Sequence, residues 1–542
     1  MTKKFSSETN LPWWKKGVIY QIYPRSFNDT SGNGIGDLKG ISKKISYLSS
    51  LGVDAIWLSP IFTSPMKDMG YDVSNYTDID PLFGNILDFE KLIEKAKENK
   101  IKVIIDQVLS HSSDAHPFFK ISKSNKNNSK SDWYVWADPK PDGSPPNNWL
   151  SVFGGSAWEW DTSREQYFLH NFLKSQPDFN FHNEDVQKWL LSTVKFWLEK
   201  GVDGFRLDTA NFYFHDKRLR NNPAIRSKAS GKNPYYFQNL KYSINQKDNF
   251  MFLKKLRRLT DEYKETTMIG EISNVELQAK YTANNDKLHM AYSFDLLRNE
   301  FSPKHLRETV TKFFKETKDG WPTWSFSNHD VVRHLSRWNK SKKYRQKFAK
   351  LTCALLMSLK GTPCIYQGEE LGQTQTKIEF DEIKDPPGKK FWPMDFGRDG
   401  CRTPMIWDEN KKFAGFSNKK PWLPIKKEQI INSAEKQLKN KNSTYHFYKK
   451  FISLRKKITF FNEEIHFKNN DEVLIFYRGN KKEICCIFNL SEGEITMDNT
   501  YGKIIPFLPS QNISQKTKKL KLSSYGFCFL SKEDLNLLDH QS

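Results

Sequence analysis

Short apolar runs alternate along this chain with amphipathic stretches, and this alternation limits the fold more than any other feature. The amphipathic stretches carry apolar residues at every third or fourth position, as helices do. Eight runs between them have the character of strands, in order GVIYQIY, DAIWLSP, KVIIDQ, GFRLD, MIGEI, MAYSF, TWSFSN and CIYQG. Strands that alternate with helices favour a parallel sheet covered by helices. We therefore expect an α/β fold, and with eight strands a (β/α)8 TIM barrel.

Two irregular segments interrupt this alternation, and a third segment replaces it. After the third run, residues 107–178 are rich in Ser, Asn, Pro, Gly and Trp and predict a small inserted domain. The long stretch 371–430 after the eighth run predicts a lid, because loops of this length usually have a function. From residue 466 strand-like runs follow one another, which is typical of an antiparallel β-domain. The expected organisation is a barrel made of 1–106 and 179–465, an inserted B domain 107–178 over the active site, a lid segment 371–430 and a C-terminal β-domain 466–542.

Several of the apolar runs break off on polar residues. IIDQVLSH, GFRLD, MIGE and FSNHD end on acids, histidines or an arginine, which are Asp106, His111, Arg206, Asp208, Glu271, His329 and Asp330. The carboxyl ends of parallel barrel strands meet at one mouth, so these side chains are expected to converge there. Carboxylates that converge with histidines and an arginine suit the cleavage of a glycosidic bond.

The neighbours of each acid indicate its role. Retaining glycoside hydrolysis needs one carboxylate as nucleophile and a second carboxyl as acid/base, about 5 Å apart. Arg206 lies on the same strand face as Asp208, two residues earlier, and would keep that nucleophile ionised. Glu271 follows the apolar segment MIG, which would raise its pKa and suit it to donate a proton. Asp330 would hold sugar hydroxyls.

The ordered motif set resembles the α-amylase family of glycoside hydrolases, family 13, and most closely its α-glucosidase and oligo-1,6-glucosidase branch. The motifs are VIYQIYPRSF, QPDFN at 176–180, the four segments above, YQGEELG and GRDGCRTPMIW. The resemblance implies that Asp208 is the nucleophile, Glu271 the acid/base and Asp330 the acid that stabilises the distorted sugar. It also implies a subsite for the non-reducing glucose lined by Tyr71, Asp72, His111, Arg206, His329 and Arg398, with Arg402 one step outward near the leaving group.

Two phenylalanines, Phe153 and Phe172, are candidates for the wall of this pocket, although core packing explains them equally well. Two other positions depart from the family pattern. Ser110 stands before His111, where the family usually has Asn, so a calcium site of the amylase type is not expected. Thr209 follows the nucleophile, where α-1,6-cleaving members tend to have Val. Its hydroxyl can reach a leaving-group sugar, and this favours α-1,4 linkages.

A possible cation loop precedes these motifs. In DTSGNGIGD, Asp29, Ser31, Asn33, the Ile35 carbonyl and Asp37 occupy alternate positions, which is how a short loop wraps oxygen ligands around a hard cation. Spacing alone also fits a glycine-rich turn with capping acids. The resemblance to the calcium loop of the oligo-1,6-glucosidase branch favours a structural Ca²⁺ or Mg²⁺, and no cofactor is expected for catalysis.

The predicted function is a retaining, exo-acting α-glucosidase that releases terminal α-1,4-linked glucose from maltose-like oligosaccharides and small α-glucosides. The alternatives are an oligo-1,6-glucosidase, a sucrose-active enzyme, or a transglucosylase or isomerase of the same family. A non-catalytic protein on the same barrel is a weaker alternative, because all three acids are present. A small oligosaccharide is the expected partner, and the chain is expected to be a monomer or homodimer.

Charge and cysteine usage bear on partners and compartment. The chain carries 85 Lys and Arg against 63 Asp and Glu, a net charge of +22, but the lysines are scattered and no nucleic-acid-binding motif accompanies them. The six cysteines form no CxxC pair, which indicates reduced, structural cysteines. The first residues lack an apolar signal region and no apolar stretch is long enough to span a bilayer. A cytoplasmic protein without nucleic-acid or membrane partners is expected.

Overall fold

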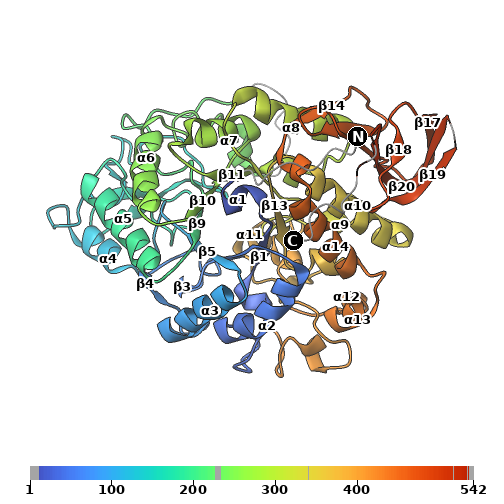
Figure 1. Cartoon of the computed structure of the whole chain (residues 1–542). Coiled ribbons are helices and arrows are strands. Elements are labelled where there is room, and N and C mark those ends of the chain that lie inside the picture. The colour runs from blue at the N-terminus through green and yellow to red at the C-terminus, as the bar shows by residue number, and fades with distance from the viewer. Residues whose placement is uncertain (1–10, 226–232, 340, 517, 534, 536–542) are drawn as a thin grey trace.

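Eight parallel strands form the centre of the molecule (Figure 1). The computed structural model describes residues 11–225, 233–339, 341–516, 518–533 and 535. The strands are β1 Ile19–Ile22, β2 Ala55–Leu58, β5 Lys102–Gln107, β9 Gly204–Leu207, β10 Thr267–Ile272, β11 Met290–Ser293, β12 Thr323–Trp324 and β13 Thr362–Tyr366. They pair in the order β11-β10-β9-β5-β2-β1-β13-β12, and a parallel bridge between Ala291 and Pro322 joins the two ends. The predicted barrel is therefore confirmed, with each predicted run in its place.

Helices follow the strands and cover the barrel. The first of them, α2, shows why they form: Leu38, Ile41, Ile45 and Leu48 recur at three and four and are all buried. Asp37 caps its start, and its end is Gly52 with φ of +99°, a left-handed conformation that suits glycine. The main helices of the barrel are α2 Leu38–Leu51, α3 Ile86–Glu98, α5 Glu184–Glu199, α6 Asp248–Asp261, α7 Val275–Thr282, α8 Pro303–Glu316, α10 Arg345–Ser358 and α14 Thr444–Lys457.

The period of two along each strand produces an apolar floor with a polar ring above it. Side chains that point into the barrel pack together at its base and include Ile19, Trp57, Ile104, Ile269 and Met290. Two positions further along the chain in each case, a polar residue follows on the same face. These residues are Gln21, Ser59, Asp106, Glu271 and Tyr292, and all are buried. The candidate site is thus built on the carboxyl ends of the strands.

A small antiparallel sheet lies between β5 and α5, within the segment 107–178. It consists of β6 Trp136–Ala137, β7 Trp158–Asp161 and β8 Gln166–Leu169 in the order β6-β8-β7, with α4 Pro117–Ser124 before it. A bridge between His111 and Asp178 ties the beginning of this segment to its end. A hairpin that the sequence did not indicate, β3 Phe62–Thr63 and β4 Asn75–Ile79, follows β2. Its connecting loop carries Asp68, Tyr71 and Asp72.

The segment 371–430 contains irregular chain with short helices, α11 Pro386–Phe391 and α12 Lys427–Ile430, and α13 Ala434–Lys439 follows it. Short helices also stand at Trp13–Lys16 (α1) and His334–Arg337 (α9). We call 371–430 the lid segment. Lys390 donates from Nζ to the Gly154 carbonyl at 2.6 Å, so the lid segment contacts the 107–178 segment directly.

The C-terminal strands form an antiparallel sheet, which confirms the predicted β-domain. They are β14 Ile465–Phe467, β15 Leu474–Arg478, β16 Ile484–Phe488, β17 Ile495–Asp498, β18 Lys503–Ile504, β19 Gln511–Lys516 and β20 Lys519–Ser531. The long β20 pairs with β16, β17, β18 and β19. In Figure 1 these strands and the helices α4 and α5 lie at opposite sides of the barrel.

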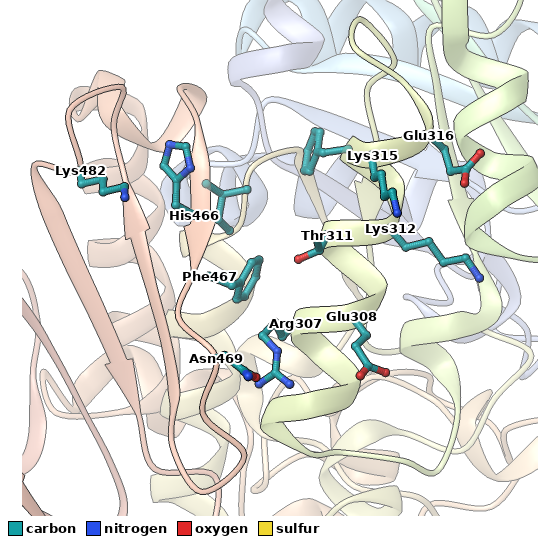
Figure 2. A pocket seen from close by; sticks show the side chains of 12 residues that line it. Arg307, Glu308, Thr311, Lys312, Lys315, Glu316, His466, Phe467, Asn469 and Lys482 are labelled. Carbon is teal, nitrogen blue, oxygen red and sulfur yellow. The ribbon is translucent and has the colours of Figure 1, made fainter.

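A groove of about 900 Å³ lies between α8 and β14 (Figure 2). Phe314 of α8 and Phe467 of β14 are among its lining residues, with Arg307 and Lys315 beside them. The lining contains none of the predicted site residues. All six cysteines are buried free thiols, as predicted. Among the described helices, none combines the length and the apolarity needed to cross a bilayer.

Candidate active site

One buried guanidinium brings the acids of three neighbouring strands together. Arg206 Nη1 lies 2.8 Å from Asp106 Oδ1 and 2.7 Å from Asp208 Oδ1. Its other terminal nitrogen, Nη2, lies 2.9 Å from Glu271 Oε2 and 2.8 Å from the Tyr292 hydroxyl. Arg206 is fully buried, so these partners are required to offset the cost of burying its charge. The predicted nucleophile and acid/base therefore share one cation.

The acids around Arg206 hold their protons more tightly than exposed acids do. Burial raises the pKa of Asp208 to about 7 and that of Glu271 to about 7, although Arg206 opposes both shifts. Burial likewise raises the pKa of Asp106 to about 6. Like charges this close do not ionise independently, so Asp208 and Glu271 titrate as a pair. One proton on this pair near neutral pH is the state that a nucleophile and a proton donor require.

Glu271 is held from three sides. Its Oε2 accepts a hydrogen bond from the backbone N–H of Thr209 at 3.0 Å, in addition to the Arg206 contact. Its Oε1 accepts from the Tyr292 hydroxyl at 3.1 Å. Tyr292 was predicted as part of a strand without a role. The signal that points to it is the period of two, because it is the polar residue that follows Met290 on the inward face.

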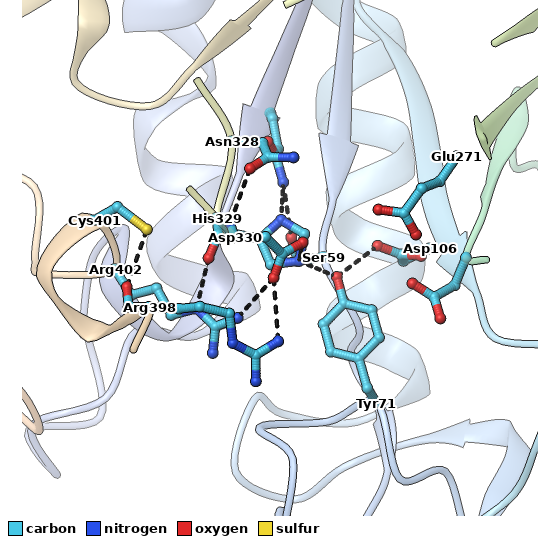
Figure 3. Close-up of polar contacts among 12 residues, drawn as sticks. Ser59, Tyr71, Asp106, Glu271, Asn328, His329, Asp330, Arg398, Cys401 and Arg402 are labelled. Atoms are coloured by element: carbon cyan, nitrogen blue, oxygen red, sulfur yellow. Dashed lines mark hydrogen bonds and ion pairs between the residues drawn. The ribbon is translucent and has the colours of Figure 1, made fainter. Parts of the chain in front are cut away.

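Asp330 lies in a second cluster of charges on the other side of the mouth, where the lid segment supplies two arginines (Figure 3). Its Oδ1 is 3.2 Å from Arg398 Nη1 and 3.0 Å from Arg402 Nη2. Its Oδ2 is 3.2 Å from His329 Nε2. Burial works to raise the pKa of Asp330, but the adjacent His329 and the two arginines hold that pKa below its usual range. Asp330 is therefore ionised at neutral pH, where Asp208 and Glu271 share one proton.

The two arginines do not lie in the predicted order. Arg402 was expected one step outward of Arg398, but its side chain is fully buried whereas that of Arg398 is 16% exposed. Arg402 also donates from Nε to the His329 carbonyl at 2.7 Å. Arg398 instead reaches toward Asp385 at 2.7 Å and Asp68 at 2.8 Å. The inner position thus belongs to Arg402 and the outer one to Arg398.

Tyr71 and the two histidines join the two clusters. The Tyr71 hydroxyl donates to Asp106 Oδ2 at 3.1 Å and also hydrogen-bonds His329 Nε2, and the two rings stack with centroids 5.4 Å apart. His111 Nε2 lies 3.1 Å from the Tyr71 carbonyl. Burial lowers the pKa of His111 to about 4 and that of His329 well below its usual value. Both imidazoles are therefore neutral at neutral pH, and they suit hydrogen bonding to sugar hydroxyls better than charge pairing.

The sequence suggested Asp72 for the glucose subsite, but in the structure Asp68 occupies that place. Asp72 accepts from the Ser64 hydroxyl and from the N–H groups of Lys67 and Asp68, so its carboxylate holds its own turn. Asp68 is the acid of this loop that reaches the site, where it pairs with Arg398. No periodic pattern marks a loop residue of this kind, and only its place four residues before Asp72 connects it with the motif.

Gln176, from the QPDFN motif, adds a contact from the 107–178 segment. Its Nε2 lies 3.1 Å from Asp68 Oδ2 and 3.1 Å from His111 Nε2. Gln176, the first residue of this motif, therefore links the loop after β3 to the loop after β5.

The candidate wall residues, Phe153 and Phe172, contact each other and two of the candidate site residues. The Phe153 ring faces the Arg398 guanidinium at 5.1 Å, and it packs edge-on against Phe172 at 5.5 Å. Phe172 in turn lies 5.2 Å from the His111 ring. Both phenylalanines are half-buried. The 107–178 segment thus contributes an aromatic wall between the outer arginine and His111.

The predicted cation loop is closed by its own hydrogen bonds. Asp29 accepts from the hydroxyls of Ser31 and Ser417 and from the N–H groups of Gly32 and Gly34. Asp37 accepts from the N–H groups of Thr30, Ser31 and Gly40 and from the Thr30 hydroxyl. Asn33 Oδ1 accepts from the Ile35 N–H at 2.8 Å. The donor set consists of oxygen atoms, which fits a hard cation. Within the described part of the chain no cluster of three or more His, Cys, Asp or Glu forms a metal site, and this loop has two such acids.

Comparison with known proteins agrees with this geometry. The family model for the catalytic domain of alpha amylase matches residues 21–464, which contain all of the barrel except the beginning of β1, and all three acids. The chain belongs to the alpha-amylase family. A probable alpha-glucosidase of Rhizobium meliloti is 47% identical over 96% of this chain and 97% of its own. An oligo-1,6-glucosidase of Heyndrickxia coagulans is 36% identical over 90% and 93%. The crystal structure of an alpha-glucosyl transfer enzyme is 45% identical, with a TM-score of 0.92 over 96% and 99% of the two chains.

The alpha-amylase family membership confirms the predicted branch and the predicted class of enzyme. The protein is a glycoside hydrolase of the α-glucosidase and oligo-1,6-glucosidase branch, and it acts on carbohydrate. The relatives differ in the linkage that their names give and in whether the sugar goes to water or to another acceptor.

Proposed function

We propose that the protein is a retaining, exo-acting α-glucosidase that releases terminal α-1,4-linked glucose from maltose-like oligosaccharides and small α-glucosides. The observation that carries this proposal is the Arg206 contact shared by Asp208 and Glu271, at 2.7 and 2.9 Å. This contact holds a carboxylate, Asp208, and a proton donor, Glu271, next to each other, as retaining hydrolysis requires. Tyr71, His111, His329 and Arg402 supply the surrounding hydrogen-bonding groups.

In the first step, Asp208 Oδ attacks the anomeric carbon of the terminal glucose. The bond from that carbon to the leaving oxygen breaks, and Glu271 gives its proton to this oxygen as the alcohol leaves. In the second step, Glu271 takes a proton from water, and the water oxygen displaces Asp208 from the glucosyl ester. Asp330 stays ionised, and its charge supports the positive character that develops on the sugar ring.

Two contacts support the exo mode. Lys390 of the lid segment bonds to Gly154, and Arg398 of the same segment pairs with Asp68 of the β3–β4 loop. Loops that are joined to one another beside the acids favour a pocket for one terminal sugar over an open cleft. Thr209 supports the α-1,4 preference, because its side chain next to the nucleophile is 8% exposed and carries a hydroxyl.

A panel of defined disaccharides tests the linkage. Glucose release from maltose should exceed release from isomaltose and from starch by about tenfold or more, a difference of the size that one well-placed polar contact gives. Preference for isomaltose would favour the oligo-1,6-glucosidase, and preference for sucrose a sucrose-active enzyme. The variant Asp208→Asn should lose at least about 10⁴-fold in kcat. Undiminished release by that variant would overturn the assignment of the nucleophile.

Transfer of glucose to a second sugar is the alternative that a specific observation favours. One similar structure is that of an alpha-glucosyl transfer enzyme, and an ester on Asp208 can react with an alcohol as well as with water. Product analysis at high maltose concentration separates the two. A transglucosylase would release about one glucose for each new saccharide that it forms, whereas a hydrolase would release two glucoses for each maltose consumed and form no new saccharide.

A structural Ca²⁺ or Mg²⁺ in the 29–37 loop is part of the same proposal, supported by the alternation of oxygen donors along it. Calorimetry after chelation should show a melting temperature lower by about 2 °C, restored when the cation is added back. An unchanged melting temperature would mean that the hydrogen bonds of Asp29 and Asp37 hold the loop by themselves.

A further inference from the structure

We infer that Ser110 is a positioning residue for the acid/base: its hydroxyl fixes the side chain of Thr209, and the Thr209 backbone N–H in turn fixes Glu271. Ser110 is one of the two positions that depart from the family pattern, and among the described residues it has no hydrogen bond to the three acids. The inference rests on the proposed function, because it takes Glu271 as the proton donor.

The first observation is the backbone of Thr209. Its φ is +41°, in the left-handed region that β-branched residues rarely adopt. Such a conformation persists where the surroundings hold it on several sides. The residues on either side of Thr209 bind the two adjacent strands. The Asp208 N–H donates to the Gln107 carbonyl of β5 at 3.1 Å, and the Ala210 N–H donates to the Glu271 carbonyl of β10 at 3.2 Å.

The second observation is the contact made by the Thr209 side chain. Its Oγ1 lies 2.9 Å from Ser110 Oγ, and Ser110 Oγ lies 2.9 Å from His111 Nδ1. Ser110 is 1% exposed and Thr209 is 8% exposed, so water does not readily replace either hydroxyl. Thr209 Oγ1 is also 3.4 Å from Asp208 Oδ2. The serine thus sets the side-chain rotation of a residue whose backbone is already strained.

The third observation connects this pair to the acid/base. The Thr209 N–H donates to Glu271 Oε2 at 3.0 Å, in the same peptide unit that the strained conformation orients. The other groups that face Glu271 are Arg206 of β9, Tyr292 of β11, and the negative charges of Asp208, Asp330 and Asp106. If Thr209 relaxes, Glu271 loses a donor to its charged form, so its proton is held more tightly and its carboxyl is less well aimed.

Two substrates with different leaving groups isolate this effect. Maltose has an alcohol leaving group that needs a proton from Glu271, whereas p-nitrophenyl α-glucoside leaves as a stable phenolate without one. For Ser110→Ala, kcat/KM should fall about tenfold for maltose and less than about twofold for the aryl glucoside, because general-acid assistance matters to the first alone. The alkaline limb of the maltose profile should move upward by about half a pH unit.

Three further variants serve as controls. Thr209→Val removes the hydroxyl and keeps the shape, and should show the same selective loss, while Thr209→Ser should keep the ratio of the wild type. Ser112→Ala removes a neighbouring buried hydroxyl that bonds to Tyr134 and has no hydrogen bond to Thr209, so the ratio should not change. In the double variant Ser110→Ala/Thr209→Val the loss should not exceed that of either single variant.

Equal losses on both substrates in Ser110→Ala and Thr209→Val would show a purely structural role and overturn the inference. If Ser110→Ala does not fold, the alkaline limb of the maltose profile of Thr209→Val decides the same question, because the loss of a contact to the leaving-group sugar would leave that limb in place. A wild type that releases glucose from neither substrate would instead refute the proposed function, so the two failures are distinguishable.

Discussion

At the scale of single residues, the guanidinium of Arg206 lies among Asp106, Asp208 and Glu271, whose charges it does not fully neutralise. Each of these acids is buried, and each has a raised pKa. A cluster with more negative than positive groups retains a proton at a pH where isolated acids have lost theirs. The same arrangement that gathers the catalytic groups also supplies the proton that catalysis uses.

The activity should therefore have a bell-shaped pH profile centred near neutral pH. The productive state has Asp208 ionised and Glu271 protonated. As the pH rises through the upper pKa of the pair, Glu271 loses its proton and activity falls; as the pH falls through the lower pKa, Asp208 gains one and activity falls again. Because burial raises both pKa values to about 7, the maximum of kcat/KM for maltose should lie close to that pH. A plateau that persists above about pH 9 would contradict this assignment.

Asp68 and Asp72 make a second prediction at this scale. Asp68→Asn removes a charged partner of Arg398, and kcat/KM for maltose should fall about a hundredfold, the size of effect expected when one member of a buried charge pair is removed. Asp72→Asn is the matched control, because its contacts lie within its own turn. It should lower the melting temperature while the activity of the folded protein stays within about threefold. If Asp72→Asn lost activity and Asp68→Asn kept it, Asp72 would be the residue that lines the pocket.

At the scale of elements, the site is completed by segments that do not belong to the barrel. The 107–178 segment brings Phe153, the β3–β4 loop brings Asp68, and the lid segment brings Arg398. The Arg398 guanidinium faces the Phe153 ring and pairs with Asp68 and Asp330. Three loops thus meet at one side chain.

Phe153→Ala tests this meeting point. The variant removes the ring over Arg398, so kcat/KM should fall by about three- to tenfold, as a partly buried cation–π contact predicts. The melting temperature should change by less than about 2 °C. Trp160→Ala, on an exposed aromatic side chain of β7 in the same segment, should leave activity unchanged. Equal effects of both variants would mean that the segment responds as a whole and that the Arg398 contact has no special part.

The strands and long helices were predictable because their signals are local and repeated. The periods of two and 3.6 place Ile104 beneath Asp106 and bury one face of α2, so the barrel and the position of the acids follow from spacing. The strands β3, β4, β17 and β19 are short or half-exposed and carry little periodic signal. The position of Asp68 depends on the path of its loop, and so does the question of which arginine, Arg398 or Arg402, lies deeper. These paths are determined by contacts between residues that are far apart in the sequence. The period of two along β11, by contrast, was enough to predict that Tyr292 points into the barrel.

At the scale of the whole molecule, two buried arginines lie where the barrel meets the C-terminal sheet. Arg455 of α14 donates to the carbonyls of Leu359 and Gly361, at 3.1 and 2.5 Å. Arg478 of β15 donates to the carbonyls of Phe461 and Glu463, at 2.6 and 2.9 Å, and also to Ser358. Burial lowers the pKa of Arg455 to about 9 and that of Arg478 to about 10. Both side chains tie down backbone carbonyls that face away from water.

Arg478→Met should destabilise the entire protein. The variant fills a similar space but leaves these carbonyls without donors, at a cost of about 2–4 kcal/mol. Calorimetry should show a single transition at lower temperature. Arg307→Met, at the groove in Figure 2, is the control. Arg307 donates to one carbonyl, that of Asn470, and pairs with Asp471, which is 64% exposed; such surface pairs contribute about 1 kcal/mol or less, so the destabilisation should be smaller. A separate early transition in Arg478→Met would show that the C-terminal sheet unfolds independently.

Both arginines that contact the Asp330 carboxylate come from the lid segment, Arg398 at 3.2 Å and Arg402 at 3.0 Å. The barrel strand that precedes Asp330, β12, has two residues and is the shortest in the barrel sheet. The counter-charges of the third acid are therefore supplied by chain outside the barrel. A change in the lid segment alters the charge balance of the site even where every barrel strand is unchanged.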